Sequence, residues 1–200
     1  MKQEEKTRLT RERIINAGIK EFGSKGYSGA SINSVSDSGI AKGLLYHNFS
    51  SKDELYIECL RVCFDRFTER LSCGGETGGI SEYFASRTAF FDENREAASM
   101  VLEAVIDPPE KHLDKIARLR KPYDEMNAEW IKRIVSSGRL RDNIDENKAM
   151  KYLSVMQDMF NWYCCNPKYR SRPFEGMISL HEEKLPEIFG YMLYGIMKEE

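Results

Sequence analysis

Apolar residues recur at three- and four-residue spacing through most of the chain, which is the pattern of amphipathic helices. In residues 10–24 this spacing is carried by Ile14, Ile15, Ala17, Ile19 and Phe22. The polar positions of the same helix are expected to face solvent, and they are Arg8, Arg11, Glu12, Lys20 and Glu21. Further helices are predicted at about 31–37, 41–48, 52–71, 80–93, 95–106, 110–137, 145–165 and 175–198. No segment shows the alternation typical of a strand, so the predicted fold class is all-α.

Glycine and serine residues mark the ends of the short helices in the first fifty residues. Gly26 is placed to end the first helix in a left-handed conformation, and Gly39 is placed to end the second. Ser31 can cap the second helix, and Ser50 or Ser51 can cap the helix that follows the third. The first fifty residues are therefore predicted to form three short helices with defined turns between them.

The second and third of these helices have the arrangement of a helix-turn-helix, two short helices joined by a tight turn that contains glycine. The second helix of such a pair fits the major groove of DNA, which is ~12 Å wide. In the helix at 41–48, Leu45 is expected to face the core together with Phe49, which leaves the polar side of the helix outward. Gly18 in the first helix suggests close approach by a neighbouring helix. A plain three-helix bundle with a solvated polar face is the alternative reading of this segment.

Charge is distributed unevenly along the chain. The 200 residues carry 30 Lys and Arg and 32 Asp and Glu, a formal net charge of −2. Residues 1–52 hold nine basic and five acidic side chains, so they carry +4 and the remaining residues −6. A cationic end on an anionic body favours a polyanion-binding segment at the N-terminal end. The chain has neither a run of ~18–20 apolar residues nor the apolar core of a signal peptide, so a cytoplasmic protein with no membrane partner is expected.

The chain shows no pattern of catalytic or metal-binding residues. The cysteines are odd in number and include an adjacent pair, which favours a reducing compartment and buried, inert thiols: Cys59, Cys63, Cys73, Cys164 and Cys165. Three widely separated histidines add nothing to a metal site. A nucleophile with a neighbouring base, a glycine-rich phosphate loop and paired carboxylates are all missing at a specific spacing. An enzyme, a cofactor and a bound metal are therefore not expected.

The spacing of residues 10–56 resembles the N-terminal module of the tetracycline-repressor (TetR) family of regulators. The agreement includes Phe22, Lys25-Gly26-Tyr27, Gly39-Ile40, Lys42-Gly43, Leu45-Tyr46, Phe49, Lys52 and Leu55. The resemblance implies an all-helical homodimer whose residues 1–52 form a DNA-binding helix-turn-helix domain. Residues 53–200 would then form an effector-binding and dimerisation domain, with 53–72 as a connecting helix. The implied function is that of a sequence-specific regulator, a repressor released from a palindromic double-stranded DNA operator by a small, mostly apolar effector.

The resemblance also assigns DNA contacts position by position. The implied DNA-binding residues are Ser31, Lys42, Gly43, Leu44, Tyr46, His47, Asn48 and Lys52. The chain departs from the family pattern at Val35-Ser36, where Ile-Ala is typical, and at Ala41, where Ser or Thr often caps the third helix. Asn48 replaces a frequent aromatic residue and could bond a base or a phosphate. These departures leave open which groups read the DNA sequence.

The rest of the chain is rich in aromatic and methionine side chains, which form either an ordinary core or an adaptable apolar pocket. The candidate effector-binding residues are Phe90, Met100, Met126, Trp130, Met156, Met159, Phe160 and Tyr163. In the family the last two long helices form a four-helix dimer interface, for which the candidates are Leu153, Met156, Phe160, Phe189, Met192 and Ile196. A glycine-rich break is expected at 73–79, and Pro122 and Pro186 are expected to kink or split their helices. The alternative function is an effector-independent DNA-binding or protein-interaction protein without a C-terminal cavity.

Overall fold

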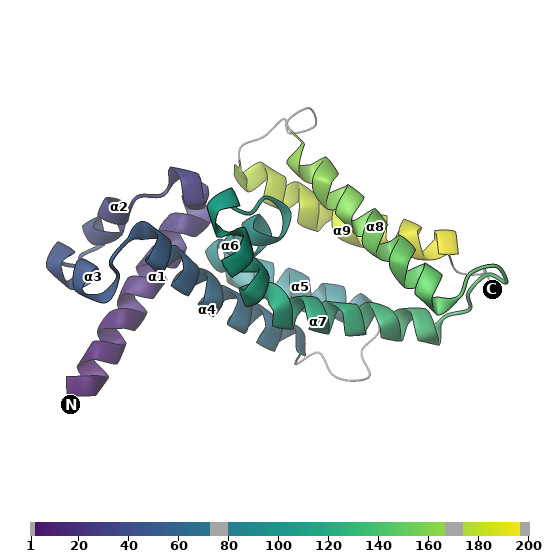
Figure 1. Cartoon of the computed structure of the whole chain (residues 1–200), viewed down its shortest axis with the longest axis horizontal. Helices are drawn as coiled ribbons and strands as arrows, with labels where there is room; N and C mark the ends of the chain where they lie inside the picture. The colour runs from purple at the N-terminus through teal and green to yellow at the C-terminus, as the bar shows by residue number, and fades with distance from the viewer. Residues whose placement is uncertain (1–2, 73–79, 167–173, 197–200) are drawn as a thin grey trace. The chain divides into compact units, whose positions relative to one another are not determined.

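The computed structural model describes residues 3–72, 80–166 and 174–196 (Figure 1). The regular elements of these residues are α1 (Gln3–Gly29), α2 (Ile32–Asp37), α3 (Lys42–Asn48), α4 (Lys52–Ser72), α5 (Ile80–Glu93), α6 (Arg95–Ile106), a 3₁₀ turn (Glu110–His112), α7 (Leu113–Ser137), α8 (Glu146–Cys165) and α9 (Phe174–Ile196). The described residues contain no strand, so the predicted all-α class is confirmed. The first helix begins earlier than predicted, and the glycine-rich break at 73–79 lies outside the described residues.

Contacts group the helices into two compact units that are each built from separate stretches of chain. Unit 1 comprises residues 1–69 and 90–119, and unit 2 comprises residues 70–89 and 120–200. Unit 1 therefore holds α1, α2, α3, most of α4 and all of α6, whereas unit 2 holds most of α5 and α7 and all of α8 and α9. The predicted boundary after residue 52 separates a DNA-binding domain from an effector-binding and dimerisation domain. Units 1 and 2 are defined by contacts alone, so that functional boundary stays a prediction.

Two glycines let α1 pack closely in unit 1. A Cβ atom on Gly18 would lie 2.7 Å from the Cys59 Sγ of α4, which confirms the close approach predicted from sequence. A Cβ atom on Gly23 would overlap the backbone of Glu96 at the start of α6. The Cys59 thiol also donates a hydrogen bond to the Ile15 carbonyl oxygen of α1 at 3.5 Å. The packing of α1 against α4 and α6 thus depends on glycine at positions 18 and 23, because a larger side chain there would block the close approach of the helices.

The turns of unit 1 follow the predicted glycine and serine positions. Gly26 interrupts α1 with φ 68° and ψ 170°, and Gly39 ends the turn after α2 with φ 90°, a region that favours glycine. Ser31 Oγ accepts a hydrogen bond from the Asn33 N–H at 3.2 Å, so it caps α2. Ala41 supplies no side-chain cap to α3. The helix-turn-helix is therefore held at its ends by the residues that the sequence indicates.

The cap of α4 combines two serines with one glutamate. Ser51 Oγ accepts a hydrogen bond from the Glu54 N–H at 3.1 Å. The Glu54 carboxylate in turn accepts from the Ser50 N–H at 2.7 Å and from the Ser50 hydroxyl at 2.6 Å. These reciprocal bonds resemble a capping box and fix the start of α4 directly after α3.

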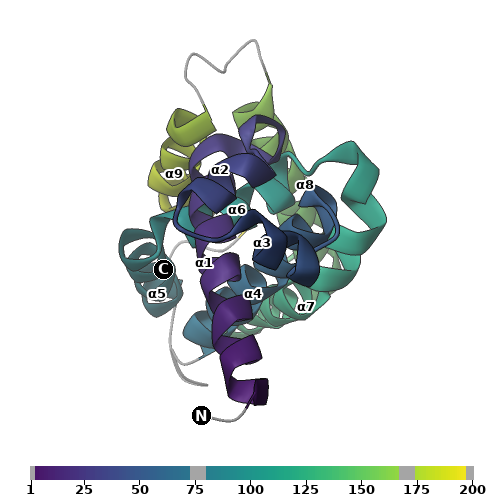
Figure 2. The same ribbon diagram turned by 90° about the vertical axis from the view of Figure 1, so that its left-hand side faces the viewer.

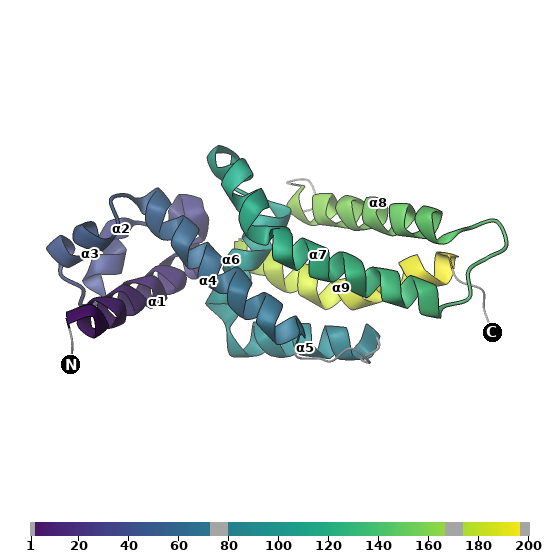
Figure 3. The same cartoon turned by 60° about the horizontal axis from the view of Figure 1, so that its bottom comes forward.

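In unit 2, α8 and α9 lie side by side (Figures 1 and 3). Their buried apolar residues form one cluster with the end of α7, and this cluster contains Val135, Ala149, Leu153, Phe160, Cys164, Leu185, Phe189 and Met192. Arg87 of α5 is buried beside it and pairs with Glu182 of α9 through two hydrogen bonds of 2.7 Å. Tyr123 accepts a third hydrogen bond from Arg87 at 3.2 Å. A doubly bonded ion pair of this kind satisfies charges that would otherwise be costly to bury.

The two internal prolines were predicted to kink or split their helices, and neither of them splits its helix. Pro122 lies inside α7 and Pro186 inside α9, and each helix continues on both sides of its proline. Both prolines are exposed, so the backbone groups that each ring leaves unpaired are near water.

Candidate DNA-binding site

The predicted recognition helix α3 is anchored by two residues on its inner side. Leu45 and Phe49 are fully buried, as their four-residue spacing predicts. The opposite side carries exposed residues, which are Lys42, Gly43, Leu44, Tyr46 and His47. In Figure 2, α2 and α3 lie on the side of unit 1 that faces the viewer, and the first turns of α1 extend below them. The α3 helix therefore presents one continuous exposed face at the surface of unit 1.

This exposed face is chemically suited to the edge of a base pair. Leu44 and Tyr46 leave 42% and 49% of their surfaces accessible, so both side chains are available for contact. Lys42, Tyr46 and His47 make no hydrogen bond or ion pair with the residues that the structure describes. An apolar side chain flanked by uncommitted donors can contact a thymine methyl group and the neighbouring acceptors in a major groove.

The other predicted DNA contacts have partners within unit 1. The Asn48 side-chain amide donates to the Leu44 carbonyl oxygen of its own helix at 2.8 Å. Lys52 Nζ lies 4.6 Å from the centre of the Tyr27 ring, a cation–π contact. Ser31 caps α2 and is partly exposed. The DNA roles of Ser31, Asn48 and Lys52 stay predictions, since each would have to combine DNA contact with these bonds.

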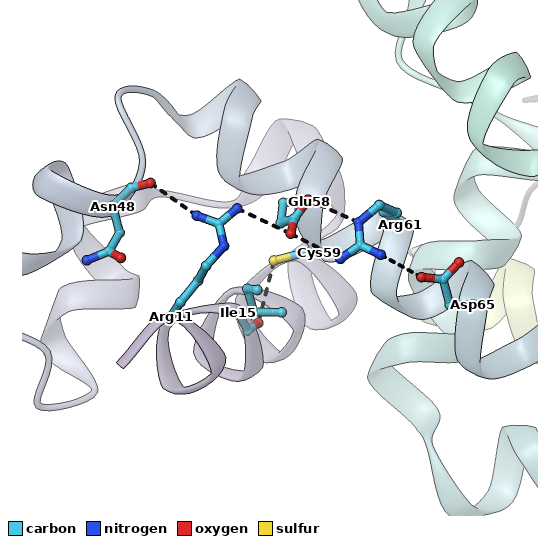
Figure 4. A network of polar contacts seen from close by, with 7 residues as sticks. All are labelled: Arg11, Ile15, Asn48, Glu58, Cys59, Arg61 and Asp65. Carbon is cyan, nitrogen blue, oxygen red and sulfur yellow. Dashed lines mark hydrogen bonds and ion pairs between the residues drawn. The ribbon is translucent and has the colours of Figure 1, made fainter. Parts of the chain in front are cut away.

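Arg11 was expected to face solvent, and 40% of its side chain is accessible, but its guanidinium also makes contacts within unit 1. Its Nη1 donates to the Asn48 carbonyl oxygen at 3.4 Å, and its guanidinium carbon lies 4.4 Å from the centre of the Phe49 ring. Its Nη2 lies 3.2 Å from Glu58 Oε1 on α4 (Figure 4). Glu21 is also drawn inward, because its carboxylate accepts from the Ser31 N–H at 3.0 Å. Helical period alone could not identify these contacts, since the partners lie on other elements.

Glu103 of α6 links that helix to the C-terminal part of α1 and to α4. Its Oε1 accepts a hydrogen bond from the Tyr27 N–H at 2.9 Å, and its Oε2 accepts from the Tyr56 hydroxyl at 3.4 Å. Burial raises the pKa of Glu103 to about 7, although the hydrogen bonds from Tyr27 and Tyr56 act in the opposite direction. The carboxyl group therefore changes charge near neutral pH at the contact of α6 with α1 and α4.

The Tyr27 side chain is tied to a second carboxylate. Its hydroxyl donates to Asp53 Oδ1 at 2.5 Å, and Lys111 Nζ lies 2.9 Å from the same oxygen. The hydrogen bond from Tyr27 and the one from Lys111 lower the pKa of Asp53 to about 2. Tyr27, directly after the Gly26 interruption of α1, therefore bonds α4 through its hydroxyl and α6 through its backbone N–H.

The raised pKa of Glu103 predicts a stability that falls as the pH rises. In the unfolded chain the pKa is near 4.5, so the folded state holds the proton more tightly between pH 4.5 and about 7. The stabilisation is fully present below pH 4.5 and is lost as the pH passes through about 7. We expect the free energy of unfolding to drop between pH 5 and pH 8 by about 1–3 kcal/mol, and Glu103→Gln to flatten that drop. Chemical denaturation across this pH range measures both slopes, and equal slopes would contradict the assignment.

The candidate effector-binding residues do not all come together. Phe90 and Met100 are buried in unit 1, where Phe90 packs on Phe67 and Met100 lies 3.9 Å from the Cys63 thiol. The other six candidates belong to unit 2. Four of those six, Met156, Met159, Phe160 and Tyr163, line a groove of about 550 Å³ along α8 and α9. The remaining lining residues are Leu180, Lys184, Ile188, Tyr191 and Met192. An effector role for any of these residues stays a prediction.

Most of the candidate dimer residues lie inside unit 2. Leu153, Phe160, Phe189 and Met192 belong to its buried cluster, and Met156 packs against that cluster. The Ile196 side chain lies outside the described residues. The exposed apolar side chains of the two helices are different ones, namely Tyr152, Val155, Met159, Trp162, Tyr163, Tyr191 and Tyr194. The sequence carries a signal for them, because residues 152, 155, 159 and 162 form a second helical stripe on α8.

Cys59, Cys63 and Cys164 are buried free thiols, and burial raises the pKa of the Cys63 thiol to about 12. Cys73 and the Cys165 side chain lie outside the described residues. Among the residues described, no three His, Cys, Asp or Glu side chains gather as metal ligands would. None of the helices described combines the length and the apolar character needed to cross a membrane.

Known proteins are similar to this chain in the sequence of its N-terminal segment and in its fold. Residues 14–59 match the family described as bacterial regulatory proteins, tetR family. The biofilm operon icaADBC negative transcriptional regulator IcaR of Staphylococcus epidermidis is 34% identical over 62 residues. That alignment covers 30% of this chain and 34% of the relative, so the match spans about a third of the curated relative's length.

Solved structures extend the similarity to the whole fold. A tetR family regulator from Shewanella sp. PV-4 aligns with a TM-score of 0.59 at 15% identity, covering 95% of this chain and 99% of that one. The regulator FadR of Bacillus subtilis, solved with stearoyl-CoA, aligns with a TM-score of 0.57 at 17% identity, covering 87% and 96%. At these identities the structural alignments show the fold alone, and the sequence match concerns residues 14–59. Residues 14–59 of the chain thus match the tetR family of bacterial regulatory proteins, and its helical fold is similar to that of solved tetR family regulators.

Proposed function

We propose that the chain is a sequence-specific DNA-binding repressor that acts through the exposed face of α3. The observation that carries the proposal is this face itself, where Lys42, Tyr46 and His47 lack partners among the described residues beside the exposed Leu44. A solvated bundle would not need an exposed apolar side chain beside three uncommitted donors on one seven-residue helix. The excess of basic residues in the first 52 positions would add a sequence-independent attraction to phosphates.

We further propose that two copies pair through α8 and α9. The exposed stripe of α8 and the exposed tyrosines of α9 leave apolar side chains in water around the groove of about 550 Å³. A second copy of the chain would cover the apolar side chains of α8 and α9 together. In a two-fold dimer the same patch on each copy forms the interface, so both copies bury these side chains. Two recognition helices would then be about 34–36 Å apart, which predicts a palindromic operator.

Trp162→Glu should break this pairing. Trp162 leaves 63% of its surface accessible in the single chain, so its indole is available to a partner. Interface tryptophans often contribute 2 kcal/mol or more, and each substitution occurs twice in a symmetric dimer, so the dissociation constant should rise about 100-fold or more. Sedimentation at micromolar concentration measures it. As a control, Ala128→Glu adds the same charge at an exposed position of α7 and should leave the dimer intact. Dimerisation of the Trp162 variant at wild-type affinity would exclude the exposed face of α8 and α9 as the interface.

An effector that releases the repressor is the finer part of the proposal. The fold is shared with a regulator that was solved with stearoyl-CoA, and the helices of unit 2 are rich in methionine and aromatic residues. A small, mostly apolar molecule would bind one of two protein states more tightly and so shift the equilibrium away from DNA.

One experiment tests the function in two steps. The purified chain is used to select duplexes from a random-sequence pool, and the selected duplex is then challenged with lipophilic compounds. The proposal expects enrichment of a palindrome and its release by one compound class. Enrichment without release by any compound would favour effector-independent DNA binding instead. Failure to enrich any sequence would contradict the repressor function.

A further inference from the structure

The end of α3 is held by a side chain from outside the helix-turn-helix. The last carbonyl groups of a helix lack partners within the helix and carry its negative dipole end. In α3 the last turn contains no Lys or Arg, and its one basic residue, His47, lies on the exposed face. Arg11 of α1 supplies the missing cation, because its Nη1 donates to the carbonyl oxygen of Asn48, the final residue of α3.

The other side of the Arg11 guanidinium is fixed to α4 (Figure 4). Its Nη2 lies 3.2 Å from Glu58 Oε1. Glu58 is in turn held by Arg61, whose Nε and Nη2 donate to its two oxygens at 3.2 and 3.1 Å. The hydrogen bonds from Arg61 and Arg11 lower the pKa of Glu58, so the carboxylate is charged at neutral pH. Arg61 itself is anchored by Asp65 at 2.6 Å.

The Arg11 side chain is further restrained by an aromatic ring. Its guanidinium carbon lies 4.4 Å above the centre of the buried Phe49 ring, directly after α3. One planar group therefore contacts the last residue of α3, the Phe49 ring directly after it, and Glu58 of α4. Only a forked guanidinium can make these contacts together, since an ammonium group is a single point charge.

We propose that Arg11 is a positioning residue that fixes the orientation of α3 by tying its C-terminal end to α4 through Glu58. The inference rests on the proposed DNA-binding function and adds to it a residue outside the helix-turn-helix. The exposed face of α3 then meets base edges at an angle set by the ion pair between Arg11 and Glu58. Loss of the tie weakens recognition of the operator more than attachment to DNA in general, because phosphate contacts depend less on the angle of α3.

The test compares affinity for the selected duplex with affinity for a duplex of unrelated sequence, each over a range of salt. Arg11→Met keeps the length of the side chain and removes its donors. We expect about a tenfold loss of operator affinity, which corresponds to one lost charged hydrogen-bonding group. Non-specific affinity and the salt slope should stay close to wild type. Arg11→Lys keeps the charge but not the fork, and it should fail to restore operator affinity.

Two further variants separate positioning from simple charge. Arg8→Met removes a cation from the same helix, where Arg8 pairs with the exposed Glu12, and it should leave the ratio of specific to non-specific affinity unchanged. Glu58→Gln removes a negative charge near the DNA-binding face, which charge alone predicts to tighten binding. The positioning role predicts the opposite sign, a weaker operator complex. Tighter binding by Glu58→Gln, or full rescue by Arg11→Lys, would overturn the proposal.

A measurement without DNA distinguishes failure of this proposal from failure of the proposed function. The Phe49 N–H donates to the Leu45 carbonyl oxygen at 2.9 Å and reports the last turn of α3. Hydrogen exchange at this amide should accelerate about tenfold in Arg11→Met relative to Arg8→Met, with other α1 amides unchanged. Equal exchange in the two variants would overturn the positioning role, even if the wild-type chain binds no operator.

Discussion

Replacing Gly23 by alanine will destabilise the protein by about 3 kcal/mol, at the upper end of the cost of overpacking a core. The added Cβ atom would overlap the Glu96 carbonyl oxygen and lie 2.6 Å from the Glu96 Cα atom. These are backbone atoms at the start of α6, so they cannot turn aside as a flexible side chain can. Thermal unfolding should therefore show a drop in Tm of about 6–12 °C.

Two other glycines calibrate this result. Gly43 meets nothing within 4 Å, so Gly43→Ala should leave stability unchanged or raise it by up to about 1 kcal/mol. Gly18→Ala should fall between the two, because the nearest atom there is the end of the Cys59 side chain. A Gly23 variant as stable as wild type would mean that α1 and α6 do not pack as closely as described.

Replacing Lys42, Tyr46 and His47 together by alanine should abolish binding to the selected duplex. The three side chains are exposed and make no hydrogen bond or ion pair with described residues, so their removal costs the fold little. Each good contact to a base edge contributes about 1–3 kcal/mol of discrimination, so three losses should reduce operator affinity by about a thousandfold or more. Fluorescence anisotropy with a labelled duplex measures the change.

The control for this triple variant changes charge at a different surface. Lys121, Lys132 and Lys151 are exposed on α7 and α8 of unit 2, so the corresponding triple alanine variant removes more charge without touching α3. It should retain operator binding. Matching unfolding curves for the two variants and the wild type show that the α3 substitutions leave the fold intact. Retained binding by the α3 variant would refute α3 as the recognition helix.

The local features of unit 1 were predictable because each depends on a few neighbouring residues. Gly26, Gly39 and Ser31 act at the backbone positions where they stand, and the four-residue spacing of Leu45 and Phe49 determines which side of α3 is buried. Contacts between distant elements were not predictable in this way. Arg11 and Glu58 lie 47 residues apart, and nothing in the pattern around either one indicates the other.

Which apolar residues of α8 are buried could not be predicted from the sequence either. The apolar residues of α8 occupy two stripes, and sequence alone does not say which one faces the core. The family resemblance assigned Leu153 and Phe160 to a dimer interface, and both belong to the buried cluster of unit 2. Trp162 and Tyr152 belong to the other stripe and are exposed. Periodicity identifies an apolar face, whereas its partner depends on tertiary packing.

The most direct test of the repressor function is a hydroxyl-radical footprint of the wild-type chain on its selected duplex. Dimeric binding through α3 predicts two protected regions centred about one helical turn apart. The α3 triple variant should remove both regions together, and the unit 2 control variant should remove neither. A single protected region, or protection that survives in the α3 variant, would contradict the proposed function.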